Sequence, residues 1–281
     1  MLWQDLRYGL RVLARRPAFA LVAVITLGLG IGANSAIFSI INGLLLRPLP
    51  YAGSDRLAII WTHSPGANVE QDWPSPGQYS AIKSQNSVFE TLAIAQGGSA
   101  NLTGYTAPER IGAVWSSSEM FSLLGVSPIF GRVFTPDEDA AGTQKTAILS
   151  YGLWQRRFGG DPNILGQALT VDGDSYNVVG VMPAEFSLSQ EVMPTVGSAA
   201  QAEILLSLPM SAKDLSSQGN ENYNVLARLK PGTTIAQAQA DLDSVVRTLE
   251  QQFPTQYPGS RRFRMSARPL LEQAVGVRCE A

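Results

Sequence analysis

Two residues near position 80 have the spacing of a serine–lysine hydrolase site. Ser80 and Lys83 are three apart, so a helix would carry both on one face. That chemistry uses a neutral lysine to activate the serine, and it needs partner motifs such as Lys-Thr-Gly, which the sequence lacks. Tyr79 and Ile82 fit the buried face of an ordinary helix. The sequence therefore favours a solvated Lys83 without a catalytic role.

The sequence also lacks the motifs of metal and cofactor sites. The acidic residues at 137–139, and Asp172 with Asp174, lack the alternating oxygen ligands and the well-placed glycine of a calcium loop, so we expect them in turns. His63 is the single histidine and Cys279 the single cysteine, which excludes a His-rich metal site, a multi-cysteine zinc site and an internal disulfide. Neither a P-loop nor an HExxH or GxSxG motif occurs. We predict no catalytic, metal or cofactor-binding residues.

The glycine run Gly28-Leu-Gly-Ile-Gly32 resembles a dinucleotide-binding loop, but it lies within thirty uncharged residues, 17–46. About 20 helical residues cross a membrane, so we predict a transmembrane helix within 17–46, from Leu21 to about Leu45. A cleaved signal peptide fits less well, because signal h-regions span only about 7–15 residues, whereas this stretch continues through Ile40 and Ile41.

Charge gives the orientation of this helix. Residues 1–16 carry four arginines and one aspartate, whereas the whole 281-residue chain has a net charge of −2, with 16% charged and 45% hydrophobic residues. The positive-inside rule places the N-terminus in the cytoplasm and residues 47–281 in the periplasm, outside the bacterial inner membrane. The acidic balance argues against nucleic acid as a partner. Leu2, Leu6 and Leu10 recur at helical spacing, which fits either an interfacial helix or a simple basic stop.

Small and polar residues within the predicted span favour contact with other helices. Gly28, Gly32 and Ala36 recur every four residues and allow close helix approach. Asn34 and Asn42 should face protein, because an amide facing lipid is costly. We predict that these five residues pack against other helices of a membrane bundle; a homodimer through the same face is the alternative.

The remainder of the chain predicts alternating strands and capped helices. Capping boxes at Ser75/Gln78 and Thr234/Gln237 mark two helix starts, and Asp172-Gly173 marks a hairpin turn. Strands are predicted at 57–61, 89–95, 109–115, 147–149, 169–171, 176–181, 204–208, 223–229 and 263–267. Helices are predicted after Ser75, at 118–124, at 150–158 and from Thr234 to Pro254. The last of these helices has an apolar face that includes Phe253. Residues 63–77, 97–108, 187–202 and 211–221 are predicted loops.

This order gives βαβ-like units near 57–95 and 223–267, with a strand-rich piece between them. The predicted fold is α/β (α+β): a transmembrane helix, then a βαβ domain interrupted by an inserted subdomain at about 117–215. A local basic patch, Arg261, Arg262, Arg264 and Arg268, fits a solvated strand edge; contact with a partner or with lipid headgroups is the alternative. His63 is expected in a loop.

Long strings of the sequence resemble a known family. The opening MLWQDLRYGLRVLARRPAFALVAVITLGLGIGANSAIFSIINGLLLRPLPY is similar to that of MacB/FtsX-type ABC transporter permeases, and most similar to the acidobacterial-type duplicated permeases. The resemblance continues through SEMFSLLGVSPIFGRVFTPDED, AILSYGLWQRRFGGDPNILGQALTVDGDSYNVVGVMPAEF and VLARLKPGTTIAQAQADLD, to about Gly276. It implies a cytoplasmic amphipathic segment (1–16), the membrane helix (17–46) and a MacB-like, porter-like periplasmic core domain (47–276).

The resemblance also implies a function without chemistry of its own. A partner ABC ATPase binds ATP and drives helix motions, and these move the periplasmic domain to export or extract a substrate. The expected partners are that ATPase, a second permease copy or duplicated half, and the lipid bilayer. Residues 277–281 do not resemble the family's continuation into three further helices, so we expect a truncated chain that does not transport alone. The alternatives are a single-span periplasmic interaction or sensor protein and a membrane-anchored hydrolase.

Overall fold

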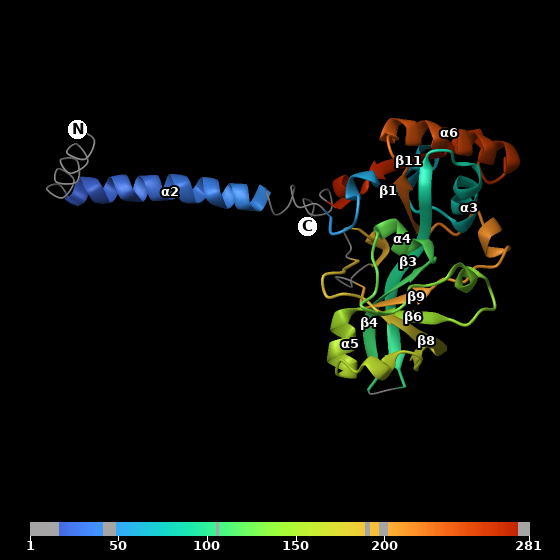
Figure 1. Cartoon of the computed structure of the whole chain (residues 1–281). Coiled ribbons are helices and arrows are strands. Elements are labelled where there is room, and N and C mark those ends of the chain that lie inside the picture. The colour runs from blue at the N-terminus through green and yellow to red at the C-terminus, as the bar shows by residue number, and fades with distance from the viewer. Residues whose placement is uncertain (1–16, 42–48, 105–106, 189–191, 197–201, 275–281) are drawn as a thin grey trace. The chain divides into compact units, whose positions relative to one another are not determined.

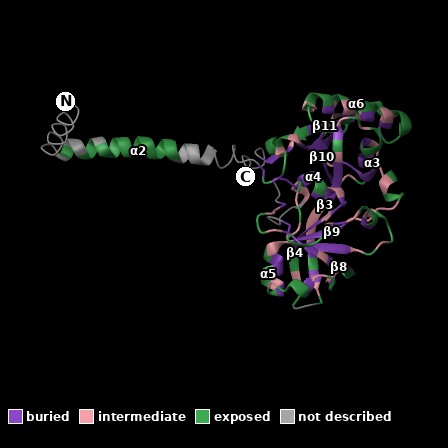
Figure 2. Ribbon diagram, in the orientation of Figure 1, coloured by how far each residue is buried: buried purple, intermediate pink, exposed green. Residues whose placement is uncertain are grey.

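The computed structural model describes residues 17–41, 49–104, 107–188, 192–196 and 202–274. The chain divides into two units, residues 1–47 and 48–281. In the first unit, α2 is a 25-residue helix, Pro17–Ile41. Its described apolar side chains are exposed, Leu21 and Leu29 by 62% and 69% (Figure 2). Across the residues that the structure describes, no helix combines the length and apolar character that a membrane crossing requires.

The second unit is a mixed α/β domain built on one sheet of 11 strands. One end of this sheet, which we call the α3–α6 lobe, has the strand order β11-β1-β10-β3 with every neighbouring pair antiparallel. Its elements are β1 (Leu57–Ser64), β2 (Val69–Asp72), α3 (Pro76–Gln85), the first half of β3 (Phe89–Thr103), β10 (Asn224–Leu229), α6 (Ile235–Gln252) and β11 (Arg264–Pro269).

Two βαβ units interleave in the α3–α6 lobe. Because β10 lies antiparallel between β1 and β3, those two strands run parallel and α3 connects them; by the same logic α6 connects β10 and β11 across β1. This is a split βαβ arrangement. Figure 1 shows α3 and α6 beside these strands. The sequence prediction of βαβ-like units at both ends of the domain is confirmed.

The predicted helix starts have the expected local chemistry. The Ser75 hydroxyl accepts from the Gln78 N–H while the Gln78 side chain accepts from the Ser75 N–H, and Thr234 and Gln237 do the same for α6. Each capping box satisfies donors that a helix start would otherwise leave free. The apolar face of α6 is buried at Ala238, Leu242 and Leu249.

The other end of the sheet, which we call the α5 lobe, closes on itself. Following pairings, β3, β4, β9, β6, β8 and β7 form a ring, because β7 pairs with both β8 and β3. The bounds are β4 Glu109–Ser116, α4 Glu119–Leu124, β5 Phe130–Gly131, β6 Thr146–Leu149, α5 Tyr151–Phe158, β7 Ala168–Val171, β8 Asp174–Val181 and β9 Ile204–Ser207. The predicted inserted part, about 117–215, begins directly after β4 and extends past β9, and these two strands pair with each other.

Strand β3 belongs to both lobes. Its first half pairs with β10 and its second half with β4, and the change occurs at Ala95. The prediction of a loop at 97–108 was therefore wrong up to Thr103. Gly97, Gly98 and Ser99 have the composition of a loop, but they continue the ladder with β4. A Cβ added at Gly98 would lie 3.5 Å from the Trp115 ring, an ordinary van der Waals contact.

Three other predictions were wrong in detail. His63 lies in β1, opposite Arg264, because the strand continues beyond Trp61. The predicted loop at 63–77 contains β2, and Phe253 is the residue after α6, 38% exposed, not part of its buried face. The other predicted strands and helices are present, with ends that differ by a few residues.

Candidate functional site

The predicted helix-packing residues lie in or beside α2. A Cβ added at Gly28 or Gly32 would have no atom within 4 Å, and Asn34 is exposed. Ala36 is helical, but its side chain lies outside the described part of the chain, as does Asn42 altogether. Within the described residues this face of α2 is open, so its packing against other helices stays a prediction.

Lys83 does not have the environment of a catalytic base. Its Nζ donates to Glu119 Oε1 at 2.6 Å and to the Tyr79 hydroxyl at 3.1 Å. Burial is the largest single influence and lowers the pKa of Lys83, but the hydrogen bonds and charges of Glu119 and Tyr79 together outweigh burial, so the pKa is raised. Lys83 therefore stays an ammonium, whereas a serine–lysine site needs a neutral lysine. Lys83 is exposed, as the sequence indicated, and it also bridges α3 to α4 through Glu119.

The acidic residues at 137–139 hold the start of α4. Asp139 accepts from the Ser118 N–H at 2.9 Å and from its hydroxyl at 2.6 Å. Glu138 pairs with Arg132 at 2.8 Å and accepts from the Thr135 N–H. Residues 136–139 form a 3-10 turn, as the turn prediction stated. Burial raises the pKa of Asp139.

Arg228 joins three segments of the domain that are remote in sequence. It lies in β10 and is 6% exposed. Its guanidinium donates to the Leu123 carbonyl at the end of α4, at 3.0 and 2.5 Å, and to the Ala52 and Gly53 carbonyls at 2.5 and 3.2 Å. A guanidinium suits this role because it presents five donors in a rigid fork. Arg228 thereby fastens residues 52–53, where the chain enters the second unit, to the junction of β10 and α4.

Residues near both ends of the described part of the second unit pack into the same hydrophobic cluster. Leu49 and Tyr51 are buried there together with Leu270 and Ala274. Tyr51 also donates its hydroxyl to the Ser187 carbonyl at 2.6 Å. The residues at 270–274 form a helical turn after β11. Because Pro269 pairs with Ala58, this turn begins at the edge of the sheet where β1 starts.

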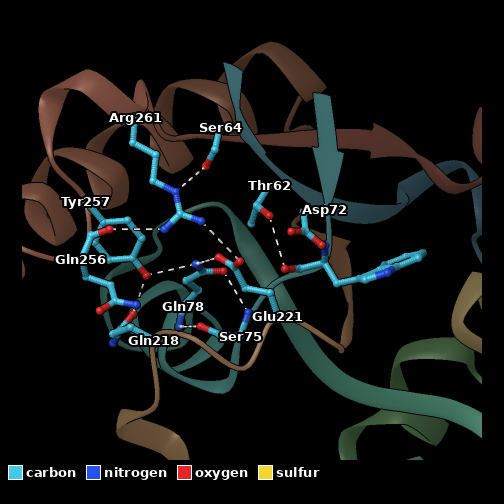
Figure 3. Close-up of polar contacts among 11 residues, drawn as sticks. Thr62, Ser64, Asp72, Ser75, Gln78, Gln218, Glu221, Gln256, Tyr257 and Arg261 are labelled. Carbon is cyan, nitrogen blue, oxygen red and sulfur yellow. Dashed lines mark hydrogen bonds and ion pairs between the residues drawn. The ribbon is translucent and has the colours of Figure 1, made fainter. Parts of the chain in front are cut away.

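The contacts of Arg228 form one joint, by which we mean a set of polar contacts between segments remote in sequence. A second joint lies where α3 begins (Figure 3). The fully buried Gln78 donates to the Tyr257 hydroxyl at 3.0 Å and to Glu221 Oε1 at 3.2 Å, and Tyr257 donates to Gln218 at 2.8 Å. Burial raises the pKa of Tyr257 to about 12. These contacts attach residues 218–221, which return the chain from the α5 lobe, to the α3–α6 lobe.

Arg261 extends this joint to β1. Its Nε donates to the Ser64 hydroxyl at 3.0 Å, and its guanidinium lies 3.5 Å from Glu221. Among the contacts drawn in Figure 3, those of Arg261 with Ser64 and of Gln78 with Glu221 and Tyr257 join segments of the domain that are remote in sequence. The arrangement supports mechanical connection between segments, and no nucleophile with an activating base occurs within it.

Glu221 is expected to make the stability of the domain depend on pH. Burial raises the pKa of Glu221 above its ordinary value, although Gln78 and Arg261 act in the opposite direction. Because the folded state holds the Glu221 proton more tightly than the unfolded state does, ionisation of Glu221 opposes folding. The contribution of protonated Glu221 to stability is present at low pH and is lost as pH rises through the folded-state pKa. We expect Glu221→Gln to be more stable than the parent at pH 7, with the difference disappearing near pH 4, in urea unfolding.

The exposed Glu185 provides the matched control for this experiment. Glu185→Gln should change stability by less than about 0.5 kcal/mol at either pH. A Glu221→Gln variant that is less stable than the parent at pH 7 would show that the ion pair with Arg261 outweighs burial, contrary to this expectation.

Sequence reasoning missed the most connected residues of the domain. Arg228 and Tyr257 were not singled out, although a charged residue in the middle of the apolar stretch Asn224–Leu229 was a usable signal. Gln78 was recognised only as half of a capping box. The structure adds that its amide nitrogen reaches Tyr257 and Glu221.

Comparisons with known proteins agree with this architecture. A family model described as the MacB-like periplasmic core domain matches residues 20–245. No curated protein sequence matches significantly. Among solved structures, a domain assigned to a permease protein of Porphyromonas gingivalis is 21% identical with a TM-score of 0.58, covering 79% of this chain and 92% of that one.

Two further solved structures have the same fold. The periplasmic region of MacB from Actinobacillus actinomycetemcomitans is 14% identical with a TM-score of 0.53, and the match covers 79% of this chain and 94% of that one. The extracellular domain of the noncanonic ABC-type transporter YknZ from Gram-positive bacteria is 14% identical with a TM-score of 0.51, covering 75% and 99%. At these identities the structural likeness establishes the fold alone.

Proposed function

Because this chain belongs to the family of MacB-like periplasmic core domains, we propose that it is the N-terminal portion of an ABC transporter permease subunit. The observation that carries the proposal is the family match over residues 20–245, which includes most of α2 as well as the second unit. The second unit would act in the periplasm, coupling ATPase-driven motion of membrane helices to export or extraction of a substrate.

The proposal places α2 in the bacterial inner membrane with the N-terminus in the cytoplasm. It is supported by the thirty uncharged residues at 17–46 and by the excess of arginine in residues 1–16. Gly28, Gly32, Asn34, Ala36 and Asn42 would contact the other helices of a permease bundle, supplied by a second permease copy or a duplicated half.

The proposed role in coupling is supported by the contacts of Arg228. Arg228 ties residues 52–53 to α4 and β10, so displacement of the segment that follows α2 would move the core of the domain. No step of this work needs catalysis by the chain or a bound cofactor. ATP would be bound and hydrolysed by a partner ATPase subunit.

Purification of the natural gene product from its own membranes tests this function. A C-terminally tagged chromosomal copy, solubilised in mild detergent, is expected to retain an ABC ATPase through a high-salt wash and to show ATP hydrolysis. The single-span interaction or sensor alternative instead predicts a homodimer without an ATPase, lost on replacing Gly28 and Gly32 with leucine. A preparation that never contains an ATPase would reject the transporter proposal.

A further inference from the structure

Strand β11 leaves one edge of the sheet open. It is the terminal strand of the order β11-β1-β10-β3, and within the described residues it pairs with β1 alone. An open edge presents a row of backbone donors and acceptors that can pair with another extended chain. Six residues, Arg264–Pro269, form this edge, which is a common strand length.

A side chain of α6 occupies part of the open edge. The Gln239 amide nitrogen donates to the Met265 carbonyl at 2.8 Å, and the Gln239 carbonyl oxygen accepts from the Ala267 N–H at 3.4 Å. The Met265 carbonyl and the Ala267 N–H both point outward from this edge, so they are the backbone groups that an added strand would bond. A glutamine side chain is flexible, so an incoming strand can displace it. The same amide nitrogen donates to Asp243 at 2.9 Å, a partner that it would keep after displacement.

The edge is basic on one face. Side chains alternate along a strand, so Arg264, Ser266 and Arg268 share one face while Met265 and Ala267 are buried beneath α6. Arg264 and Arg268 are exposed, as is Arg262 just before the strand. A cavity of about 290 Å³, lined by His63, Gln239, Arg264, Met265 and Ser266, lies beside the edge.

His63 fixes the arrangement at this cavity. Its Nδ1 contacts the Glu70 carbonyl, which can only accept, so Nδ1 carries the proton and Nε2 accepts from the Ser266 hydroxyl at 2.7 Å. Ser266 is thereby held with its side chain between those of Arg264 and Arg268 on the strand. The basic face therefore presents two arginines four residues apart on a rigid edge.

We propose that the β11 edge binds an acidic, extended peptide segment of a partner protein, which adds as a strand and displaces the Gln239 amide. Acidic residues at alternate positions would face Arg264 and Arg268, and a small apolar residue between them would enter the cavity. Pairing of β11 with the β11 of a second copy is disfavoured, because it would bring like charges together across the interface. The inference needs only the β11 edge and goes beyond the proposed transport function.

Peptide binding to the full-length chain in detergent tests the proposal. The probe is the fluorescent peptide Thr-Glu-Val-Glu-Val-Glu-Thr, followed by anisotropy. We expect Arg264→Glu with Arg268→Glu to weaken binding at least tenfold, and Gln239→Ala to strengthen it about threefold because the competitor is removed. Arg110→Glu, at an exposed arginine of β4, is the matched control and should leave affinity unchanged. Amide exchange at Met265 and Ala267 should slow when the peptide binds.

Three comparison probes make the result decisive. Thr-Lys-Val-Lys-Val-Lys-Thr should not bind, and Thr-Glu-Pro-Glu-Pro-Glu-Thr, which keeps the charge but lacks the backbone donors between its glutamates, should bind at least tenfold more weakly. Equal binding of the proline peptide would overturn strand addition. Arginine-dependent binding to phosphatidylglycerol vesicles without peptide binding would assign the patch to lipid, and arginine-dependent self-association would assign it to a second copy; either result overturns the proposal.

Discussion

Replacing Arg228 with alanine is expected to destabilise the second unit by about 3–5 kcal/mol, because an unsatisfied buried polar group costs about 1–3 kcal/mol. The buried carbonyl of Leu123 and the part-buried carbonyl of Ala52 lose the guanidinium donor, and the carbonyl of Gly53 keeps only the Arg56 N–H. The end of α4 also loses a positive charge that favours its terminal carbonyls. The measurement is urea unfolding of the full-length chain, followed by tryptophan fluorescence.

Two variants make the Arg228 experiment specific. Arg228→Lys keeps the charge but lacks the forked donors, so it should lose a large part of the same stability. Arg110→Ala removes an exposed arginine whose guanidinium bonds only the nearby Ser99 among described contacts, and it should change stability by less than about 0.5 kcal/mol. If Arg228→Ala behaved like Arg110→Ala, the incoming segment would not depend on this guanidinium.

Replacing Gly66 with alanine is expected to cost about 2–4 kcal/mol, since forced overpacking costs about 1–3 kcal/mol and occasionally more. An added Cβ would lie 1.8 Å from the Ser260 carbonyl oxygen and 2.9 Å from the carbonyl of Arg261. These atoms are backbone, so the turn at 259–261 must move as a whole. That movement would separate Arg261 from Ser64 and Glu221, which lie 3.0 and 3.5 Å away.

Gly259 supplies the control within the same turn. A Cβ at Gly259 would have no atom within 4 Å, so Gly259→Ala should change the free energy of unfolding by less than about 0.5 kcal/mol. Urea unfolding gives both values, and amide exchange at residues 261–264 should accelerate only in Gly66→Ala. A Gly66→Ala variant as stable as Gly259→Ala would show that the two turns are not packed as described.

Local signals in the sequence predicted most of the secondary structure. The capping boxes at Ser75 and Thr234 mark helix starts because their side chains bond backbone groups only three residues away. The Asp172-Gly173 turn predicted a hairpin for the same reason, since Asp172 and Gly173 both adopt the positive φ that such turns require. Information within a few residues is enough for these elements.

The order of the strands and the partners of the polar residues depend on distant segments. Arg228 bonds Ala52 across 176 positions of the sequence, and Lys83 bonds Glu119 across 36. Nothing in the sequence near Arg228 or Lys83 indicates these partners, which is why the ion pair of the exposed Lys83 with Glu119 was not predicted. The ladder through Gly97 and Gly98 was missed because glycine usually weakens a strand, and the packing of Trp115 against Gly98 is visible only in three dimensions.

Leu49 and Ala274 are buried in one hydrophobic cluster, and the start of β1 pairs with the end of β11, which has a consequence for engineering. A unit whose two ends meet can be placed in a surface loop of another protein with little loop-closure entropy, as inserted domains are. The region from residue 49 to residue 274 should therefore be transplantable as a cassette between two adjacent positions of a host protein. Such a chimera would present the open β11 edge free of α2, in a soluble carrier of the experimenter's choice.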